Sequence, residues 1–288
     1  MKNILNLFVV LTLILSLITY KYMNNKKDDE EYNAYTSLVF STKDGVLIPV
    51  SVPYNSSKDF EMDMRNRFVL MQSEEYKDLG LYPVFSKELN LNYSYIENNI
   101  LYIDFNDAFD FTHSIDLLEI TSYLVHDITE VKDVKLTING KESDVKYNMS
   151  EDNKSKLGLN NFINFTDNIT HSLSATCYKY ETINNHDYYV PYTLRLSDKL
   201  ELNDNIIQLL SHIDPRIQIE QLNLKDGCLS VHLSSHILLD NEQIDKQLEN
   251  CIYLSALSFD NINDIIIYIN NEEISRYNHK EILINSIE

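Results

Sequence analysis

The segments NILYIDF (residues 99–105) and GCLSVHL (residues 227–233) decide the fold, because they are two versions of one strand. Position 99 of the first segment corresponds to position 227 of the second. Another pair of similar segments, VKLTING (134–140) and IIIYINN (265–271), follows in the same order and at nearly the same spacing. Two matches in one order, each within the same kind of element, indicate an internal repeat.

A third pair, VLIP (46–49) and YYVP (188–191), precedes the other two, and it aligns Pro49 with Pro191. The stretch from Pro49 to Asn99 is longer than its counterpart from Pro191 to Gly227. The second copy therefore lacks residues between its first hairpin and its next pair of strands, and the missing part corresponds to residues 72–87.

Local sequence patterns predict the same element order in both copies. Strands are expected where apolar residues alternate around Gly, Asn or Asp turns, and helices where they recur every three or four residues. The first copy is predicted to hold a hairpin at 35–52, a helix at 58–71 capped by Asn55, Ser56 or Ser57, a hairpin at 91–105, a helix at 112–130 and a strand at 134–139. The second copy is predicted to hold a hairpin at 173–196, a helix at 205–212, strands at 216–224 and 228–234, a helix at 241–259 and a strand at 265–269. We therefore predict an α/β (α+β) fold of two tandem, superposable domains, each ordered β-β-α-β-β-α-β.

The N-terminal segment indicates a membrane anchor. Residues 4–20 contain no charged side chain. This uncharged segment has about the minimum length for a spanning helix and is longer than most signal-peptide cores. No A-x-A cleavage site can follow it closely, because the first alanine is Ala34, and the first cysteine, Cys177, is too distant for a lipoprotein signal. A cleaved signal peptide is the alternative. The expected anchor residues are Ile4, Leu7, Phe8, Leu11, Leu15 and Ile18.

These features divide the chain into five predicted parts. They are a transmembrane anchor (1–23), a polar tether (24–33), a first domain (34–146), a linker rich in Asn, Ser and Asp (147–170) and a second, diverged domain (171–288).

Charge and composition exclude several classes of partner. With 24 basic and 44 acidic residues the formal net charge is −20, and such a surface repels the phosphates of nucleic acids. We therefore expect no nucleic-acid partner. Cysteines 177, 228 and 251 lack metal-site spacing and are expected to be buried apolar residues.

Catalytic and cofactor motifs are absent from the sequence. It contains no G-x-S-x-G, H-E-x-x-H, G-x-x-x-x-G-K or G-x-G-x-x-G segment. His232 and His236 are four positions apart, but a strand followed by a loop does not bring them onto one face. We therefore predict a protein that is not an enzyme and that has no cofactor or metal site.

Three features are candidates for a contact with a partner. Asp104 is expected to point outward from its strand, where it either binds a partner or organises the strand exit through hydrogen bonds. The loop with no counterpart in the second copy carries Leu81, Tyr82 and Phe85, which give it more apolar surface than an idle loop needs. Tyr93, Tyr95 and Tyr102 either form a face for glycans or peptides or pack across strands.

Four segments of the first copy carry a family resemblance: LIPV (47–50), LGLYP (79–83), LYIDFNDAF (101–109) and the segment from Tyr123 through VKLTINGK (134–141). They resemble the "lvPv", "gL-P", "atVdLs-eF" and "yTL…V..V.i.vdGk" motifs of the GerMN domain of bacterial sporulation and spore-germination proteins. The family's Thr-Leu is Leu124-Val125 here. In the second copy His232, Ile237 and Asn271 replace the strand Asp, the exit Phe and the closing Gly, and the two copies cover about residues 34–145 and 171–274.

The resemblance implies a compact α/β domain similar to the ring-building modules of secretion and sporulation channels. It also implies a scaffold role at the membrane, with a cytoplasmic N-terminus and both domains outside the cytoplasm. We therefore predict a single-pass, membrane-anchored, non-enzymatic scaffold or interaction protein of sporulation or germination, with envelope or sporulation-complex proteins as partners and its oligomeric state left open. The alternative is a binding module for peptidoglycan or a small envelope ligand.

Overall fold

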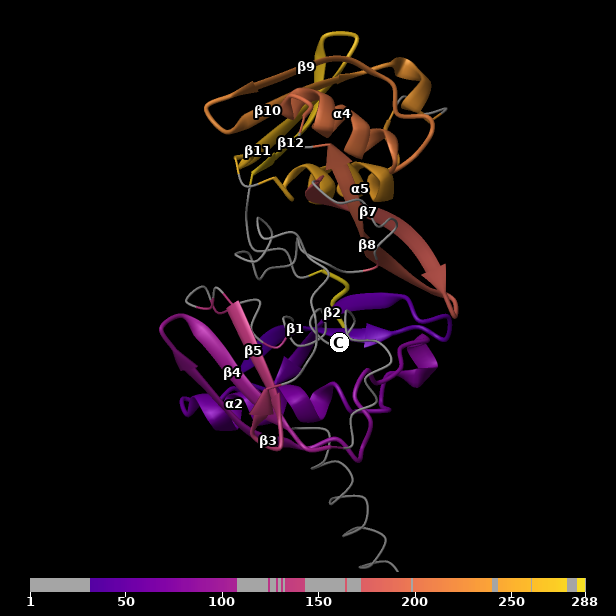
Figure 1. The fold of residues 1–288 in the computed structure, drawn as a ribbon. Coiled ribbons are helices and arrows are strands. Elements are labelled where there is room, and N and C mark those ends of the chain that lie inside the picture. The colour runs from indigo at the N-terminus through magenta and orange to yellow at the C-terminus, as the bar shows by residue number, and fades with distance from the viewer. Residues whose placement is uncertain are drawn as a thin grey trace, which may run out of the picture.

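The fold consists of two similar halves, one above the other (Figure 1). The computed structural model describes residues 32–107, 124, 128, 131, 133–142, 164, 172–197, 199–239, 243–259, 261–278 and 284–287. The predicted anchor, and most of the predicted tether, of the predicted helix at 112–130 and of the linker, lie outside these residues. Within them, no helix is long and apolar enough to cross a membrane.

The first half contains a two-stranded and a four-stranded sheet. β1 (Ala34–Ser41) and β2 (Leu47–Tyr54) form an antiparallel hairpin, followed by helix α2 (Phe60–Leu70) and the short 3-10 helix η1 (Lys77–Leu79). The second sheet has the order β3-β4-β5-β6, with strands Leu91–Glu97, Ile100–Phe105, Asp133–Ile138 and Lys141–Glu142. β4 and β5 run parallel, so the chain between them must cross over.

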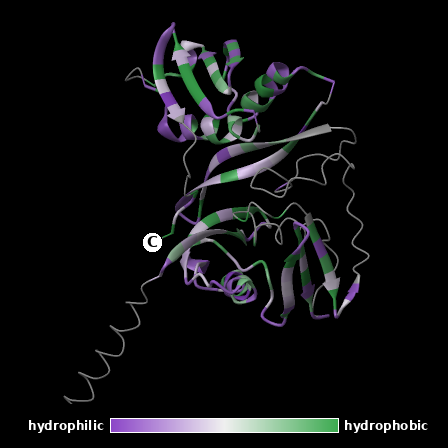
Figure 2. Ribbon diagram, turned by 90° about the vertical axis from the view of Figure 1, so that its left-hand side faces the viewer, coloured by the Kyte–Doolittle hydropathy of each residue, from purple (hydrophilic) through white to green (hydrophobic). Residues whose placement is uncertain are grey.

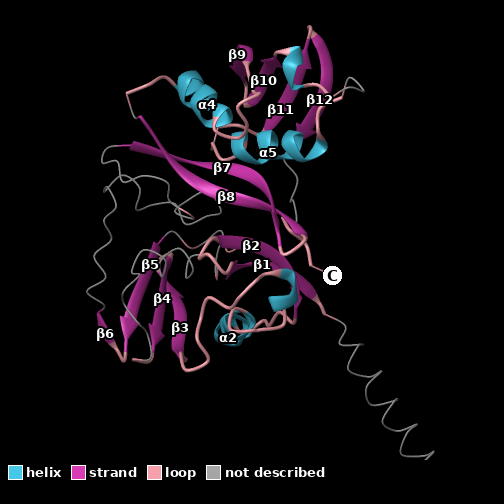
Figure 3. Ribbon diagram, turned by 90° about the vertical axis from the view of Figure 1, so that its right-hand side faces the viewer, coloured by secondary structure: helices cyan, strands magenta, loops and turns pink. Residues whose placement is uncertain are grey.

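The second half repeats this arrangement. β7 (Ser172–Ile183) and β8 (His186–Ser197) form a longer hairpin, followed by helix α4 (Leu202–Ser211). The four-stranded sheet has the order β12-β11-β10-β9, with strands Glu272–Asn278, Asp264–Ile269, Cys228–Leu233 and Ile219–Lys225. The 3-10 helix η4 (Ser235–Ile237) and helix α5 (Lys246–Ala256) connect β10 to β11, and Figure 3 shows α5 lying along β7.

Strand register confirms the repeat with the correspondences read from the sequence. β4 pairs with β5 through Leu101 and Val134, and β10 pairs with β11 through Leu229 and Ile265. The sequence repeats align the same residues, Leu101 with Leu229 and Val134 with Ile265. Both hairpins also carry a bulge at one equivalent position, residue 92 in β3 and residue 220 in β9. A shared bulge is a specific backbone feature, so the two sheets are copies of one design.

The turns that allow this register use the residues that tolerate a left-handed backbone. Asn98-Asn99 has φ values of 53° and 64°, and its counterpart Asp226-Gly227 has 52° and 80°. Two such residues in succession form the type I′ turn, whose twist matches that of the flanking strands. The β7–β8 hairpin turns in the same way at Asn184-Asn185, with φ values of 50° and 63°, so the predicted hairpins at 91–105 and 173–196 are confirmed. Strands β6 and β12 extend the predicted order by one strand in each copy.

Each half has its own apolar core, and Figure 2 shows apolar and polar residues alternating along the strands. The first core gathers β1, β2, α2 and the inner faces of β3–β5, and the second gathers β10, β11, α4 and α5. Tyr188 and Val190, near the tip of the β7–β8 hairpin, belong to the first core, whereas Leu194 and Leu196 belong to the second. This hairpin therefore joins the two halves.

Helices α2, α4 and α5 all begin at other residues than the sequence predicted, and α4 begins at Leu202 where the prediction was Asn205. Helix α2 is capped by Asp59, whose side chain accepts a hydrogen bond from the Met62 amide at 2.9 Å, and not by residues 55–57. Helix α5 begins after its cap Asp245, whereas the sequence pattern predicted a start near Asn241. An aspartate cap fits the positive end of a helix well, so in α2 and α5 a carboxylate fixes the start.

Candidate functional site

Asp104 lies at the end of β4 and is almost fully buried, with 2% of its surface exposed. Its Oδ1 accepts hydrogen bonds from Thr137 Oγ1 at 2.5 Å and from the Gly140 amide at 2.8 Å, and its Oδ2 accepts one from Asn92 Nδ2 at 2.8 Å. These donors come from β5, from the turn after β5 and from the bulge in β3. The carboxylate therefore fixes three strands at their exit, and of its two predicted roles the structure supports the organising one.

The protonation of Asp104 reflects this environment. Burial alone would raise its pKa, but the hydrogen bonds from Thr137, Asn92 and Gly140 outweigh burial and hold the pKa below its ordinary value. The folded protein therefore binds this proton less tightly than the unfolded chain. The resulting stabilisation is present at pH values above about 4 and is lost as the pH falls through the lowered pKa.

Replacing Asp104 by asparagine should reduce the stability of the protein at pH 7 by about 1–3 kcal/mol, because the buried donors lose a charged acceptor. The stability difference from the wild type should shrink below pH 4, where Asp104 itself becomes protonated. Urea unfolding at pH 7 and pH 3 measures both effects. The exposed neighbour Asp107, changed to asparagine, is the matched control, and an equal loss in the two variants would contradict this role for Asp104.

The second copy does not reproduce the Asp104 site. Its equivalent residue is His232, which pairs with Tyr268, and the two rings stack with centroids 4.7 Å apart. A ring stack thus stands where the first copy has a carboxylate network. A site present in only one copy is not a shared catalytic constellation.

The loop that has no counterpart in the second copy is largely part of the first core. Leu81 is 0% and Phe85 2% exposed, and the Phe85 ring contacts those of Phe68 and Phe105 at centroid distances of 4.8 and 5.9 Å. The prediction that these two side chains form a partner surface is therefore wrong. A loop without periodicity was expected at the surface, but its apolar residues complete the core between α2 and β4.

Tyr82 remains the partly exposed member of this set, and its backbone is tied to the first sheet. The Tyr82 amide donates to the Ser41 carbonyl at 2.7 Å, and the Ser41 amide donates to the Tyr82 carbonyl at 2.9 Å. These bonds extend the edge of β1. A contact of the Tyr82 side chain with a partner stays a prediction.

The same loop, which the second copy lacks, contacts another part of the same chain. Asn184 Nδ2, at the tip of the β7–β8 hairpin, donates to the Asp78 carbonyl at 2.6 Å. The Tyr188 hydroxyl donates to the Leu79 carbonyl at 2.8 Å. The loop therefore receives the hairpin of the second half.

An aromatic face lies on the outer side of the first four-stranded sheet. Tyr93 and Tyr95 are 38% and 44% exposed, and the Tyr95 ring stacks on that of Tyr102 with centroids 4.8 Å apart. Lys135 Nζ lies 5.3 Å from the centroid of Tyr102. The rings thus both pack across strands and remain open to solvent. At the equivalent positions of β9 the second copy has Gln221 and Asn223, so this aromatic face belongs to the first copy alone.

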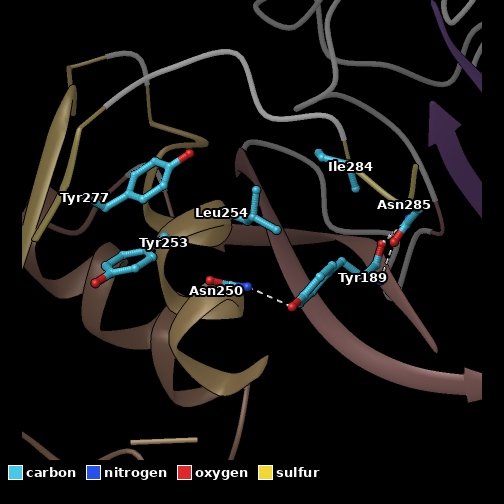
Figure 4. Close-up of a pocket in the computed structure, with 7 residues that line it drawn as sticks. All are labelled: Tyr189, Asn250, Tyr253, Leu254, Tyr277, Ile284 and Asn285. Carbon is cyan, nitrogen blue, oxygen red and sulfur yellow. Dashed lines mark hydrogen bonds between the residues drawn. The ribbon is translucent and has the colours of Figure 1, made fainter. Parts of the chain in front are cut away.

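A small cavity lies where the second half meets the C-terminal segment (Figure 4). Its lining residues are Tyr189, Asn250, Tyr253, Leu254, Tyr277, Ile284 and Asn285. Asn250 Nδ2 donates to the Tyr189 hydroxyl at 2.8 Å, and the rings of Tyr253 and Tyr277 stack at 4.9 Å. The volume is about 110 Å³, well below the roughly 300–1,000 Å³ typical of ligand pockets. The cavity is therefore part of a joint between elements and not a substrate site.

Within the part of the chain that the structure describes, no three His, Cys, Asp or Glu side chains converge as a metal site would require. Cys177 and Cys251 are buried, and burial raises the pKa of both thiols to about 12, which keeps them protonated and unreactive. The prediction of buried cysteines is confirmed for these two, whereas Cys228 is partly exposed.

Sequence reasoning missed one set of residues entirely, the asparagines at the joint between the halves. Asn285 and Asn164 each follow an isoleucine, in the segments LINS (283–286) and FINF (162–165). Other asparagines, such as Asn139 and Asn270, also follow an isoleucine, so this pair does not single out the two residues. The two residues fall in segments assigned to a linker and to the end of the second domain.

Comparison with known proteins identifies the fold. No family model and no curated protein matches the sequence. Among solved structures, the chain is similar to the tandem GerMN domains of the sporulation protein GerM from Bacillus subtilis, with a TM-score of 0.67 and 17% sequence identity over 83% of this chain and 92% of that one. It also matches the first GerMN domain of the same protein, with a TM-score of 0.33 and 16% identity over 38% of this chain and 86% of that one. The described residues therefore have the fold of tandem GerMN domains, as the sequence motifs predicted.

Proposed function

We propose that this protein is a membrane-anchored, non-enzymatic scaffold of the bacterial envelope that acts in sporulation or germination. The observation that carries the proposal is the likeness to a tandem GerMN structure over both halves, because the structure it matches is that of a sporulation protein. Fold alone does not determine function, so the proposal also draws on the site.

Two features of the described residues support a role in binding. Among them no three His, Cys, Asp or Glu side chains converge, and the one buried carboxylate singled out from the sequence, Asp104, organises strands. The residues outside the core instead form extended sheet faces and edges, which are the usual means by which small α/β modules bind other proteins. The apolar segment at residues 4–20 supports attachment to a membrane.

The experiment that tests this function is an in-frame deletion in the bacterium that encodes the protein. We expect normal vegetative growth and a loss of heat-resistant spores, or spores that fail to germinate. A copy starting at Asp28 should be recovered from the soluble fraction and should not restore the phenotype, whereas the full-length chain should fractionate with membranes and restore it. Normal sporulation and germination of the deletion strain, or full rescue by the anchorless copy, would contradict the proposal.

The alternative function, binding of peptidoglycan, is favoured by the exposed aromatic face. Flat, stacked tyrosine rings flanked by polar groups present an apolar surface with hydrogen-bonding edges, which suits the faces of sugar rings. Under this alternative, the full-length chain should co-sediment with purified cell-wall sacculi, and Tyr95→Ala should abolish co-sedimentation. Under the scaffold proposal neither the wild type nor the variant sediments with sacculi.

A further inference from the structure

The two halves present sheet edges to each other. β2 pairs with β1 on one side and β8 pairs with β7 on one side, so the other edge of each of these two strands has no neighbouring strand in its own sheet. Figures 1 and 3 show these two hairpins at the centre of the molecule, where the halves meet. Open edges of this kind need a cover, because their amides and carbonyls are otherwise free to pair with another chain.

One edge-to-edge contact is made by the side chain of Asn285. Its Oδ1 accepts a hydrogen bond from the Tyr189 amide at 2.8 Å, as drawn in Figure 4. Its Nδ2 donates to the Tyr189 carbonyl at 3.0 Å and to the Pro49 carbonyl at 2.7 Å. The carboxamide thus imitates a peptide group and links β8 to β2, which do not bond to each other directly at this point.

A second contact, made by Asn164, has the same three bonds. Its Oδ1 accepts from the Leu47 amide at 2.8 Å, and its Nδ2 donates to the Leu47 carbonyl at 2.7 Å and to the Pro191 carbonyl at 2.8 Å. The two asparagines even share a left-handed backbone, with φ values of 50° for Asn164 and 51° for Asn285. Asparagine is one of the few residues that adopts this conformation at low cost.

The two contacts are related by the repeat itself. The alignment that places Pro49 on Pro191 also places Leu47 on Tyr189, so exchanging the halves converts the bonds of Asn285 into those of Asn164. This reciprocity is the property of an isologous interface, in which a two-fold axis relates two copies of one surface. The joint therefore has the symmetry of a homodimer within a single chain.

The C-terminal segment also crosses from one half to the other. The Ser51 amide donates to the Ile284 carbonyl at 3.1 Å, and the Ile287 amide donates to the Ser51 carbonyl at 3.0 Å, so the segment adds to β2 of the first half. Ile284 is 6% exposed and packs with Tyr178 and Cys251 of the second half, whereas Ile287 packs against the first core. The segment thus bridges both halves through its backbone and its side chains.

We propose that the facing edges of β2 and β8, at Pro49, Ser51 and Tyr189, form a peptide-binding site that selects an Ile-Asn segment. The C-terminal residues 284–287 are its ligand. Selection follows from the geometry at Asn285. Aspartate cannot donate to the carbonyls of Tyr189 and Pro49, and alanine makes none of the three bonds. The bound segment holds the two halves together as one body.

The first test uses the full-length chain and amide hydrogen exchange measured by NMR. In Asn285→Ala the Tyr189 amide loses its acceptor and should exchange at least about tenfold faster, while the Leu47 amide stays protected. In Asn164→Ala the effects should be reversed, which makes each variant the control for the other. Unchanged protection of Tyr189 in Asn285→Ala would overturn the proposal.

The second test supplies the segment as a separate peptide. A chain ending at Leu283 should bind the nonapeptide KEILINSIE (280–288), and fluorescence anisotropy measures this binding. The same peptide with Asn285→Asp should bind at least about tenfold more weakly. If the shortened chain is unfolded alone, the first peptide should restore its circular dichroism spectrum and the second should not. Failure of the unmodified peptide to bind or restore folding, or equal behaviour of the two peptides, would refute the site.

Discussion

Replacing Phe85 by alanine should destabilise the protein by about 3–5 kcal/mol, the range measured when a buried aromatic ring is removed from a core. The Phe85 side chain is 2% exposed and its ring contacts those of Phe68, on α2, and Phe105, at the end of β4. Its removal leaves a cavity where helix, sheet and loop meet. The loss would appear as a lower urea midpoint with an unchanged slope.

The control for Phe85→Ala is Tyr82→Ala in the same loop. Tyr82 is partly exposed and contributes to the sheet through its backbone bonds to Ser41, which alanine retains. We expect a loss below about 1 kcal/mol for this variant, in keeping with substitutions outside cores. Equal stability of Phe85→Ala and the wild type would show that the loop is not part of the core.

The second large effect is expected for Asp63→Ala in α2. Asp63 Oδ2 accepts a hydrogen bond from Arg67 Nε at 2.9 Å, and both residues are buried, with 8% and 4% of their surfaces exposed. Arg67 also donates to the Leu124 carbonyl at 3.1 Å and to the Tyr54 hydroxyl at 3.0 Å, so it stays buried when Asp63 is removed. Removing Asp63 breaks this buried ion pair, and breaking a buried ion pair at one of its two partners costs about 3–5 kcal/mol.

The same helix supplies the matched control for Asp63→Ala. Glu61 and Arg65 form an ion pair with the same i,i+4 spacing at 2.7 Å, but their side chains are 49% and 44% exposed. Glu61→Ala should cost less than about 1 kcal/mol, because exposed pairs are solvated and screened. Similar losses in Asp63→Ala and Glu61→Ala would contradict this account of the buried pair.

Local patterns and repeats were enough to predict most of the fold. The three repeat pairs fixed the correspondence of the strands, because turns such as Asn98-Asn99 and Asp226-Gly227 impose their register within a few residues. Strands β6 and β12 were missed because they follow the last recognised turn of each copy and carry charged residues in place of an alternating apolar pattern.

The errors concern residues whose environment depends on distant parts of the chain. Asp104 lies on the outward face of its strand, as predicted, but Thr137 and Asn92 close over it. Leu81 and Phe85 lack periodicity, so only the packing of α2 against β4 reveals that they are buried. The alternation of apolar and polar residues along one strand contains no information about neighbours from other parts of the chain.

The contacts between the two halves were not predicted from the sequence at all. Asn285 bonds to Pro49 across 236 positions, and no local pattern distinguishes it from the many other asparagines of this chain. The equivalent bonds of Asn164 and Asn285 depend on how the two halves are placed, which no local pattern encodes.

Two copies of one module are held as a single body by Asn164 and Asn285 together with the β7–β8 hairpin, whose Tyr188 and Val190 are buried in the first core. Double electron–electron resonance between spin labels at Met62 on α2 and Ile207 on α4, both exposed, tests it in a chain with Cys228→Ser, since Cys177 and Cys251 are buried. We predict one narrow distance distribution that broadens in the double variant Asn164→Ala, Asn285→Ala. A broad distribution in the chain that retains both asparagines would contradict the claim.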